Sequence, residues 1–124
     1  MEFGEQSGFR FQNLAIWQRA ADLAIALDEA SDQLDERRKY RFAEQLRAAG
    51  LSISNNIAEG SGSNTTPDFR RFLFIARKSA FECASMLIIF KRRNYIAETI
   101  ADPLISDLET LCKMIISFSR KLKD

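Results

Sequence analysis

The apolar residues of this sequence recur at steps of three and four, and this spacing constrains the fold more than any other feature. Residues spaced in this way fall on one face of an α-helix, whereas a half-buried strand requires strict alternation of apolar and polar residues. Four segments carry such a stripe, and no segment shows the alternation. The sequence therefore predicts an all-α protein.

The four stripes define four helices, and helices joined by short connections pack most simply as an antiparallel up-down-up-down four-helix bundle. We expect this bundle domain to span residues 11–124, after a flexible N-terminal arm over residues 1–10, which contain two glycines and no periodic pattern. The stripe residues, in chain order, are Ile16, Ala20, Leu23, Leu27, Ala30 and Leu34; Ala43, Leu46, Gly50, Ile53 and Ile57; Phe69, Leu73, Ala76, Ala80, Cys83, Leu87 and Phe90; and Leu104, Leu108, Leu111, Ile115, Phe118 and Leu122.

The helix boundaries are marked by residues with short polar side chains, which cap helices, and by proline. Asp32 and Asp35 are candidate N-caps of the second helix, and Thr66 is a candidate N-cap of the third. The fourth helix has two possible starts, a helical turn over residues 97–100 or a first residue at Pro103.

Composition excludes several classes of protein. The 124 residues are 46% hydrophobic, with 18 Lys and Arg against 17 Asp and Glu, and they include no histidine. Ser-His-Asp, Cys-His and His-ligated zinc chemistry are therefore excluded, and we expect no enzyme, no metal and no cofactor. The longest apolar run, residues 86–90, falls far short of the roughly 20 residues needed to cross a bilayer, so no membrane association is expected.

The cellular compartment is indicated by the N-terminus and the cysteines. The first residues are acidic and lack the order of a secretory signal, which predicts a cytoplasmic protein. Cys83 and Cys112 lie among apolar residues. The preferred interpretation is a pair of buried free thiols, and the alternative is a disulfide or redox pair.

The third helix carries a second apolar line beside its stripe. Phe74, Phe81 and Ile88 follow one another at seven-residue intervals. At 3.6 residues per turn this ridge stands about 120° around the helix from the stripe. It is either the edge of a broad core face or a subunit interface. The interface is the preferred interpretation, because such bulky residues lie well away from the centre of the core.

Positive charge is concentrated on the same helix. Residues 61–93 contain 7 basic and 2 acidic residues, a net charge of +5, although the whole chain carries only +1. This segment is either an ordinary solvated face or a cationic strip of the kind that follows a phosphate backbone. The candidate nucleic-acid-binding residues are Arg70, Arg71, Arg77, Lys78 and Arg92.

Polar residues form a line on the second helix, where Ser52, Asn56 and Glu59 follow at steps of four and three. A carboxylate in the last turn of a helix faces the negative end of the helix dipole. We therefore expect Glu59 to have a compensating cation, either Arg47 or Arg77, or to join an interface network. A catalytic role for Glu59 is the least favoured alternative, since no nucleophile or second acid accompanies it.

The segment at residues 45–62, and above all Asn56-Ile57-Ala58-Glu59-Gly60, resembles the hallmark of the four-helix-bundle family named for 23S ribosomal RNA intervening sequences. The likeness continues at residues 14–17, 72–77 and 111–114, so it covers nearly the whole body of the chain.

This resemblance implies a bacterial cytosolic protein that assembles into a ring of five and has no established enzymatic activity. Some family members are encoded within insertions in ribosomal RNA genes, and the similar accessory protein of diversity-generating retroelements binds nucleic acid and a reverse transcriptase. The sequence departs from the family pattern at Ala48 and Ser63, where basic residues are common, and at Lys78, where glycine is usual.

Two functions remain open from the sequence. The first is a non-enzymatic homo-oligomeric module, with five copies favoured by the resemblance, that presents a basic surface to RNA or to an RNA–protein complex. The second is a protein-only scaffold that docks a partner protein without contacting nucleic acid.

Overall fold

A computed structural model describes residues 8–123 of the chain, and within them the secondary structure is helical, without strands. The elements are the short 3-10 helix η1 (Arg10–Asn13) and the α-helices α2 (Ala15–Glu36), α3 (Tyr40–Ser61), α4 (Thr66–Arg92) and α5 (Glu98–Lys121). The predicted all-α class is therefore confirmed. The expected flexible arm falls mainly on residues 1–7, outside the described residues, and Arg10 already belongs to η1.

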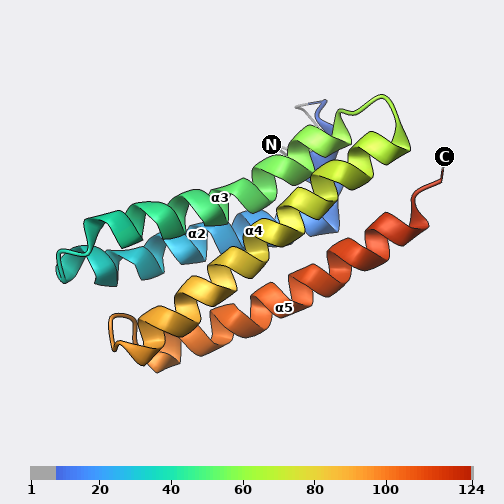
Figure 1. The fold of residues 1–124 in the computed structure, drawn as a ribbon. Helices are drawn as coiled ribbons and strands as arrows, with labels where there is room; N and C mark the ends of the chain where they lie inside the picture. The colour runs from blue at the N-terminus through green and yellow to red at the C-terminus, as the bar shows by residue number, and fades with distance from the viewer. Residues whose placement is uncertain (1–7, 124) are drawn as a thin grey trace.

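The four α-helices run alternately up and down (Figure 1). Helix α3 packs against α2 and α4, and α5 closes the bundle against the same two helices. The turns between α2 and α3 and between α4 and α5 lie at one end of the bundle, and both ends of the described chain lie at the other (Figure 1). This is the up-down-up-down arrangement that the stripes predict.

The predicted stripes form the core. Every stripe residue of α2, α3 and α4 is buried, whereas Phe118 and Leu122 of α5 are only partly covered. Helices α2 and α3 approach closely at Gly50, where a Cβ atom would stand 2.9 Å from Cδ1 of Leu27. No helix among residues 8–123 combines the length and the apolar character that crossing a membrane requires.

The expected caps of the second helix are wrong. Helix α2 continues to Glu36, so Asp32 and Asp35 lie inside it, and α3 follows Lys39 without a side-chain cap. The physical reason is that both aspartates bind an arginine of α3, as described below, and this interaction keeps the end of α2 helical.

At the starts of α4 and α5, sequence alone does not distinguish between neighbouring candidate positions. Thr65, and not Thr66, caps α4, because its Oγ1 accepts a hydrogen bond from the backbone N–H of Asp68 at 3.2 Å. Helix α5 starts at Glu98, the earlier of the two possible positions, and Pro103 lies within it. The backbone N–H of Ala97 donates to Oε1 of Gln33 at 2.9 Å, which anchors this start to α2.

Candidate interaction surfaces

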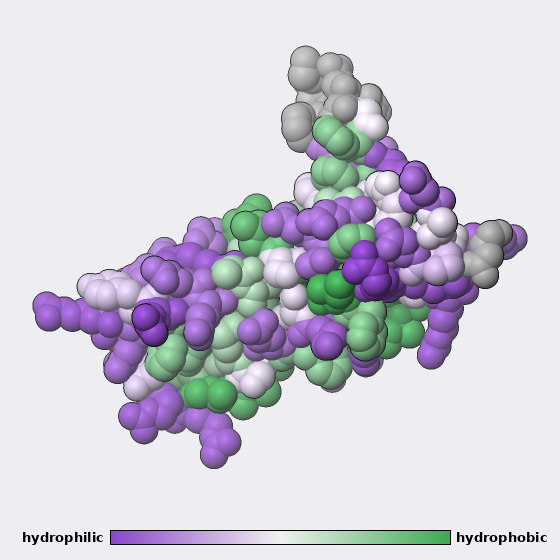
Figure 2. All heavy atoms as spheres, turned by 45° about the horizontal axis from the view of Figure 1, so that its top comes forward, coloured by the Kyte–Doolittle hydropathy of each residue, from purple (hydrophilic) through white to green (hydrophobic). Residues whose placement is uncertain are grey.

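The apolar ridge of α4 lies outside the core of the single chain. Phe74 is 57% exposed, Phe81 56% and Ile88 44%, and Ile89 beside them is 53% exposed. The interpretation of the ridge as the edge of a broad core face is therefore wrong. Figure 2 shows apolar side chains reaching the surface in several places between hydrophilic ones.

A groove of about 610 Å³ runs between α4 and α5, and two of the three ridge residues line it. Phe81 and Ile88 line it from α4, and Ile105 and Ile116 line it from α5. Its size is typical of binding sites, and its walls are mostly apolar. The surface that the ridge offers is thus larger than the ridge itself, because a neighbouring helix adds apolar side chains to it.

Arg77 also lines this groove. Its Cζ atom lies 4.7 Å from the centroid of the Phe81 ring, in a cation–π contact. Its Nε atom is buried and has no hydrogen-bond acceptor. A buried donor without an acceptor is rare in folded proteins and costs about 1–3 kcal/mol. Arg77 therefore carries a buried polar atom that residues 8–123 leave without a hydrogen-bond partner.

Two of the predicted nucleic-acid-binding residues bind atoms of their own chain. The guanidinium of Arg71 pairs with the Asp68 carboxylate at 3.0 Å. Arg70 donates from Nε to the backbone oxygen of Ser119 at 3.2 Å, and from Nη2 to that of Leu122 at 2.6 Å. Arg70 therefore ties α4 to the C-terminus of α5, where a cation suits the helix dipole.

The remaining candidates are spread along α4. Lys78 is exposed, and its Nζ lies 5.4 Å from the centroid of the Phe74 ring. Arg92 is exposed at the far end of the helix, beside the α4–α5 turn. With Arg77 partly buried in the groove, the predicted set does not form one continuous strip of free cations.

Two residues of the predicted polar line on α3, Ser52 and Asn56, are hydrogen-bonded to each other. The Nδ2 atom of Asn56 donates to the backbone oxygen of Ser52 at 2.8 Å and to Oγ of Ser52 at 3.0 Å. The Ser52 hydroxyl also shares a hydrogen bond of 3.0 Å with the Ser79 hydroxyl, so the cluster joins α3 to α4.

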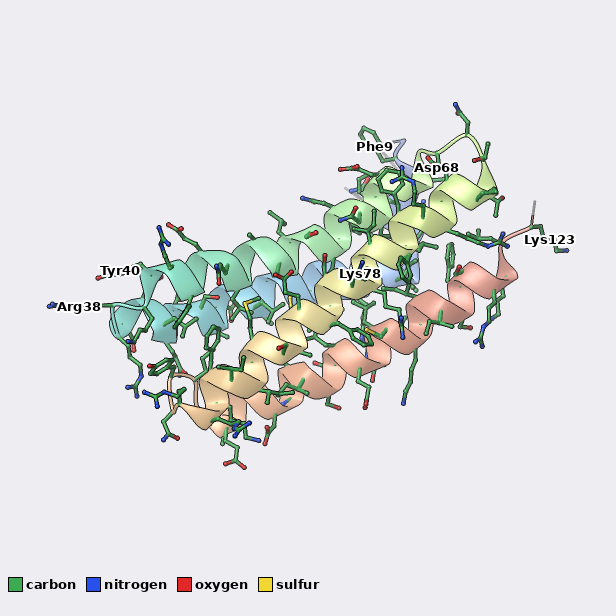
Figure 3. All side chains as sticks on the ribbon, viewed as in Figure 1. Phe9, Arg38, Tyr40, Asp68, Lys78 and Lys123 are labelled. Atoms are coloured by element: carbon green, nitrogen blue, oxygen red, sulfur yellow. The ribbon has the colours of Figure 1, made fainter. Side chains whose placement is uncertain are left out.

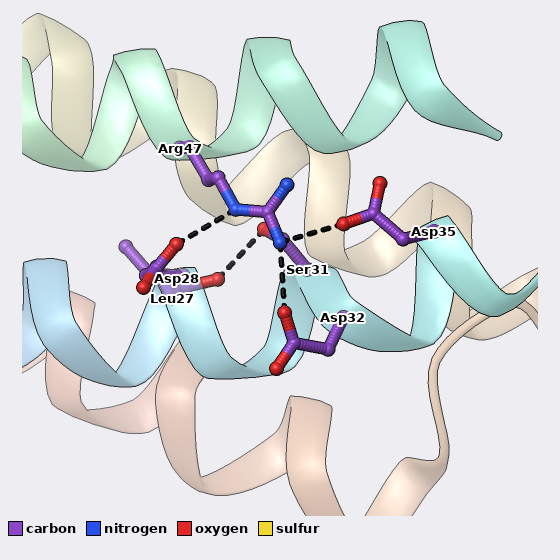
Figure 4. A network of polar contacts seen from close by, with 6 residues as sticks. All are labelled: Leu27, Asp28, Ser31, Asp32, Asp35 and Arg47. Carbon is purple, nitrogen blue, oxygen red and sulfur yellow. Dashed lines mark hydrogen bonds and ion pairs between the residues drawn. The ribbon is translucent and has the colours of Figure 1, made fainter.

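Arg47 belongs to a different network, which is a correction to the predicted pairing with Glu59. Its guanidinium bonds to the carboxylates of three residues of α2 (Figure 4): Asp28 at 2.7 Å, Asp32 at 2.8 Å and Asp35 at 2.8 Å. The hydrogen bond to Asp35, with a further one to Asp28, raises the pKa of Arg47 above its ordinary value. The network clamps α2 to α3. Its sequence signal was the spacing of the three aspartates at steps of four and three, which puts them on one helix face.

Glu59 is exposed and forms no ion pair within residues 8–123. Arg47 stands twelve positions before it on the same helix, about 18 Å away at 1.5 Å per residue, and is out of reach. Arg77 does not pair with it either. Neither candidate cation is therefore correct.

Both cysteines are free, which confirms the preferred interpretation of the sequence. Burial raises the pKa of Cys83 to about 12, and it also raises the pKa of Cys112, which lines the α4–α5 groove. Among the described residues no three side chains of His, Cys, Asp or Glu are gathered so that they could hold a metal ion.

The Cys83 thiol is expected to be unreactive in the folded protein, because the thiolate is the nucleophile and is scarce at about pH 8 when the pKa is so high. We expect Ellman's reagent to titrate Cys83 of a Cys112→Ser variant only after denaturant is added. Rapid reaction of the folded variant would show that the thiol is neither buried nor protonated as the structure places it.

The fold defines the protein as an antiparallel four-helix bundle with an exposed apolar ridge and groove on one face. The chain belongs to the 23S rRNA-intervening sequence protein family, whose model matches residues 12–117. This confirms the resemblance carried by the hallmark residues, which lie on α3.

The fold is also similar to a solved structure, that of a protein of unknown function from the S23 ribosomal protein family of Bacteroides thetaiotaomicron. The two chains are 24% identical, and the match covers 86% of this chain and 100% of the other, with a TM-score of 0.82. No curated protein sequence matches the chain.

Proposed function

We propose that this protein is a non-enzymatic, cytoplasmic interaction module that associates with further copies of itself and presents basic residues to RNA or to an RNA–protein complex. The observation that carries the proposal is the ridge of Phe74, Phe81 and Ile88, more than 40% exposed along its length in the single chain. The name of the family supports the link to ribosomal RNA, and the lack of histidine supports a role without catalysis.

Self-association is favoured by energetics. The ridge extends over about 21 Å of helix, and fully burying one Phe side chain contributes roughly 1.5–3 kcal/mol. Exposed apolar patches of this kind mark interaction sites.

A second copy of the chain is the occupant that the groove favours. Its rim carries charges of both signs, Glu109 and Lys113, so that neighbouring copies can offer each other complementary charge. Closed symmetric homo-oligomers are the commonest assemblies of soluble proteins. The family resemblance favours a ring of five.

Light scattering coupled to gel filtration tests the assembly. We expect a mass five times that of the single chain, unchanged on dilution through the micromolar range. Another closed multiple would contradict the number five but retain the self-association. A mass equal to that of one chain at every concentration would contradict the self-association itself.

Filter retention of labelled RNA tests the second part of the proposal. Binding to phosphates releases counterions, so the logarithm of the affinity should fall linearly with the logarithm of the salt concentration. An oligomer that retains no RNA even at low salt would instead support the protein-only scaffold.

A further inference from the structure

The end of the bundle at which both turns lie gathers two basic runs that are far apart in the sequence. We call it the basic end. Its members come from the α2–α3 turn with the start of α3, and from the end of α4 with the α4–α5 turn: Arg37, Arg38, Lys39, Arg41, Lys91, Arg92 and Arg93.

The two runs are in contact. Lys39 of one run and Arg93 of the other both stand over the Tyr95 ring, with Nζ of Lys39 at 5.0 Å and Cζ of Arg93 at 5.6 Å from its centroid. A hollow of about 570 Å³ beside Tyr95 is lined by Arg37 from the first run and by Arg92 from the second. The cations lower the pKa of Tyr95, with Arg93 the largest cause, which agrees with a positive local field.

Most of this charge is not neutralised by ion pairs with the described residues. Lys91 binds the Asp102 carboxylate at 2.6 Å, but the other six cations form no ion pair within residues 8–123. The same segments carry three carboxylates that are likewise without ion pairs: Glu36, Glu44 and Glu98. The basic end therefore holds twice as many unpaired cations as unpaired anions.

Helix stability accounts for only some of these cations. Arg37 and Arg92 are at the C-terminal ends of α2 and α4, where the helix dipole favours positive charge. Lys39 and Arg41 flank the first residue of α3, where the dipole opposes it, and no acidic residue offsets them in that turn. Arg38 adopts the left-handed region, with φ of 61°, directly after the C-cap of α2, and the N–H of the next residue donates back into the last turn of α2, as is usual at a helix C-terminus. The positive charges of Lys39 and Arg41 are therefore the ones that the dipole of α3 does not explain.

Exposed aromatic rings accompany the charges. Tyr40 is 58% exposed, and Figure 3 shows that it projects from this end of the bundle together with Arg38. Phe42, in the first turn of α3, is 40% exposed, with its ring 5.1 Å from that of Phe90. Cations interleaved with exposed rings are typical of surfaces that bind single-stranded nucleic acid, because phosphates contact the cations and unpaired bases stack on the rings.

We propose that the basic end is a binding site for single-stranded RNA, with its phosphates on the six unpaired cations and a base stacked on Tyr40. This inference rests on the proposed function. It names the place on the molecule where the RNA binds, which is the bundle end and not the length of α4. An unpaired strand is favoured over a duplex, whose bases are stacked on one another and cannot lie on a tyrosine ring.

Two charge-reversal variants with the same change of net charge test the location. One replaces Arg37, Arg38 and Arg93 by Glu. Its matched control replaces Arg71 and Lys78 of α4, with the exposed Arg120 near the C-terminal end of α5, by Glu. The probe is fluorescein-labelled oligouridine of about 20 nucleotides, followed by anisotropy over a salt series, with the mass of each protein checked by light scattering.

The bundle-end variant is expected to bind the probe on the order of a hundredfold more weakly at low salt. Three lost phosphate contacts should also reduce the salt slope by about 2, at about 0.7 per contact for single strands. The control variant should bind the probe less than about tenfold more weakly than the wild type, because only its general charge changes. Equal losses, or a larger loss in the control, would overturn the location while leaving RNA binding by the protein intact.

Substitutions of Tyr40 distinguish the contribution of base stacking to RNA binding from that of charge. Tyr40→Ala should weaken binding of oligouridine by roughly fivefold to a hundredfold, whereas Tyr40→Phe should preserve it, because stacking requires only the ring. Equal affinity of the Tyr40→Ala variant and the wild type would overturn the stacking. Polyglutamate, a polyanion without bases, serves as a second probe. If the wild type bound polyglutamate and no RNA, both the binding site and the RNA part of the proposed function would be contradicted.

Discussion

A Phe81→Asp variant is expected to be a folded monomer. Phe81 is 56% exposed and lies at the junction of the ridge and the groove, so the core loses little when it is replaced. In an assembly, the aspartate would leave a charge in an apolar contact, and the burial of the ring, roughly 1.5–3 kcal/mol per interface, would be lost. Circular dichroism should show unchanged helix content, and light scattering should give the mass of one chain.

Ile25 offers a matched control for this variant. It is 60% exposed on α2 and does not line the α4–α5 groove. Ile25→Asp introduces the same charge at a similarly exposed apolar position and should leave the wild-type mass unchanged. Two outcomes would contradict the interface: an unchanged mass of Phe81→Asp, or its unfolding, which would put Phe81 in the core.

Replacing Leu27 by alanine is expected to give the largest loss of stability, about 2–5 kcal/mol in the free energy of unfolding. The Leu27 side chain is fully buried where α2 meets α3, and its removal leaves a cavity facing Gly50. Urea unfolding of the Phe81→Asp background measures the effect without the contribution of subunit dissociation. A loss below about 1 kcal/mol would show that the helices close over the gap.

A second substitution at Gly50 tests the close approach itself. In the wild type, a Cβ at position 50 would stand 2.9 Å from Cδ1 and 3.3 Å from Cβ of Leu27. Alanine is favoured over glycine inside a helix by about 1 kcal/mol, and this close contact offsets that gain. In the Leu27→Ala background the nearer atom is gone, so Gly50→Ala should be clearly more favourable there. Strictly additive effects of the two substitutions would contradict the contact.

The fold was predictable because one periodic pattern determines it. Each apolar stripe must be buried, and four amphipathic helices with short connections have few ways of burying them. The cap positions were less predictable, because Thr65 and Thr66 have the same chemistry and only backbone geometry decides between them. The role of Asp32 and Asp35 required knowing that Arg47 faces α2 across the interface.

The surfaces were predictable in part for the same reason. Seven-residue spacing placed Phe74 and Phe81 together on one helix, but the groove needs α5, whose orientation the sequence does not give. The basic end was not predicted because its two runs lie far apart in the sequence, and the run at the end of α4 has an ordinary explanation by itself in the helix dipole. Only the up-down-up-down course brings Lys39 and Arg93 to the same tyrosine.

The antiparallel course also decides how the molecule can be handled. Because Lys123 lies at the end of the bundle opposite the two turns (Figure 3), a biotin or a dye attached to the side chain at this position points away from those turns. Protein tethered to a sensor surface in this way would hold Arg38 and Tyr40 outward into the flowing solution. A peptide inserted into the α2–α3 turn would bury them beneath its own bulk.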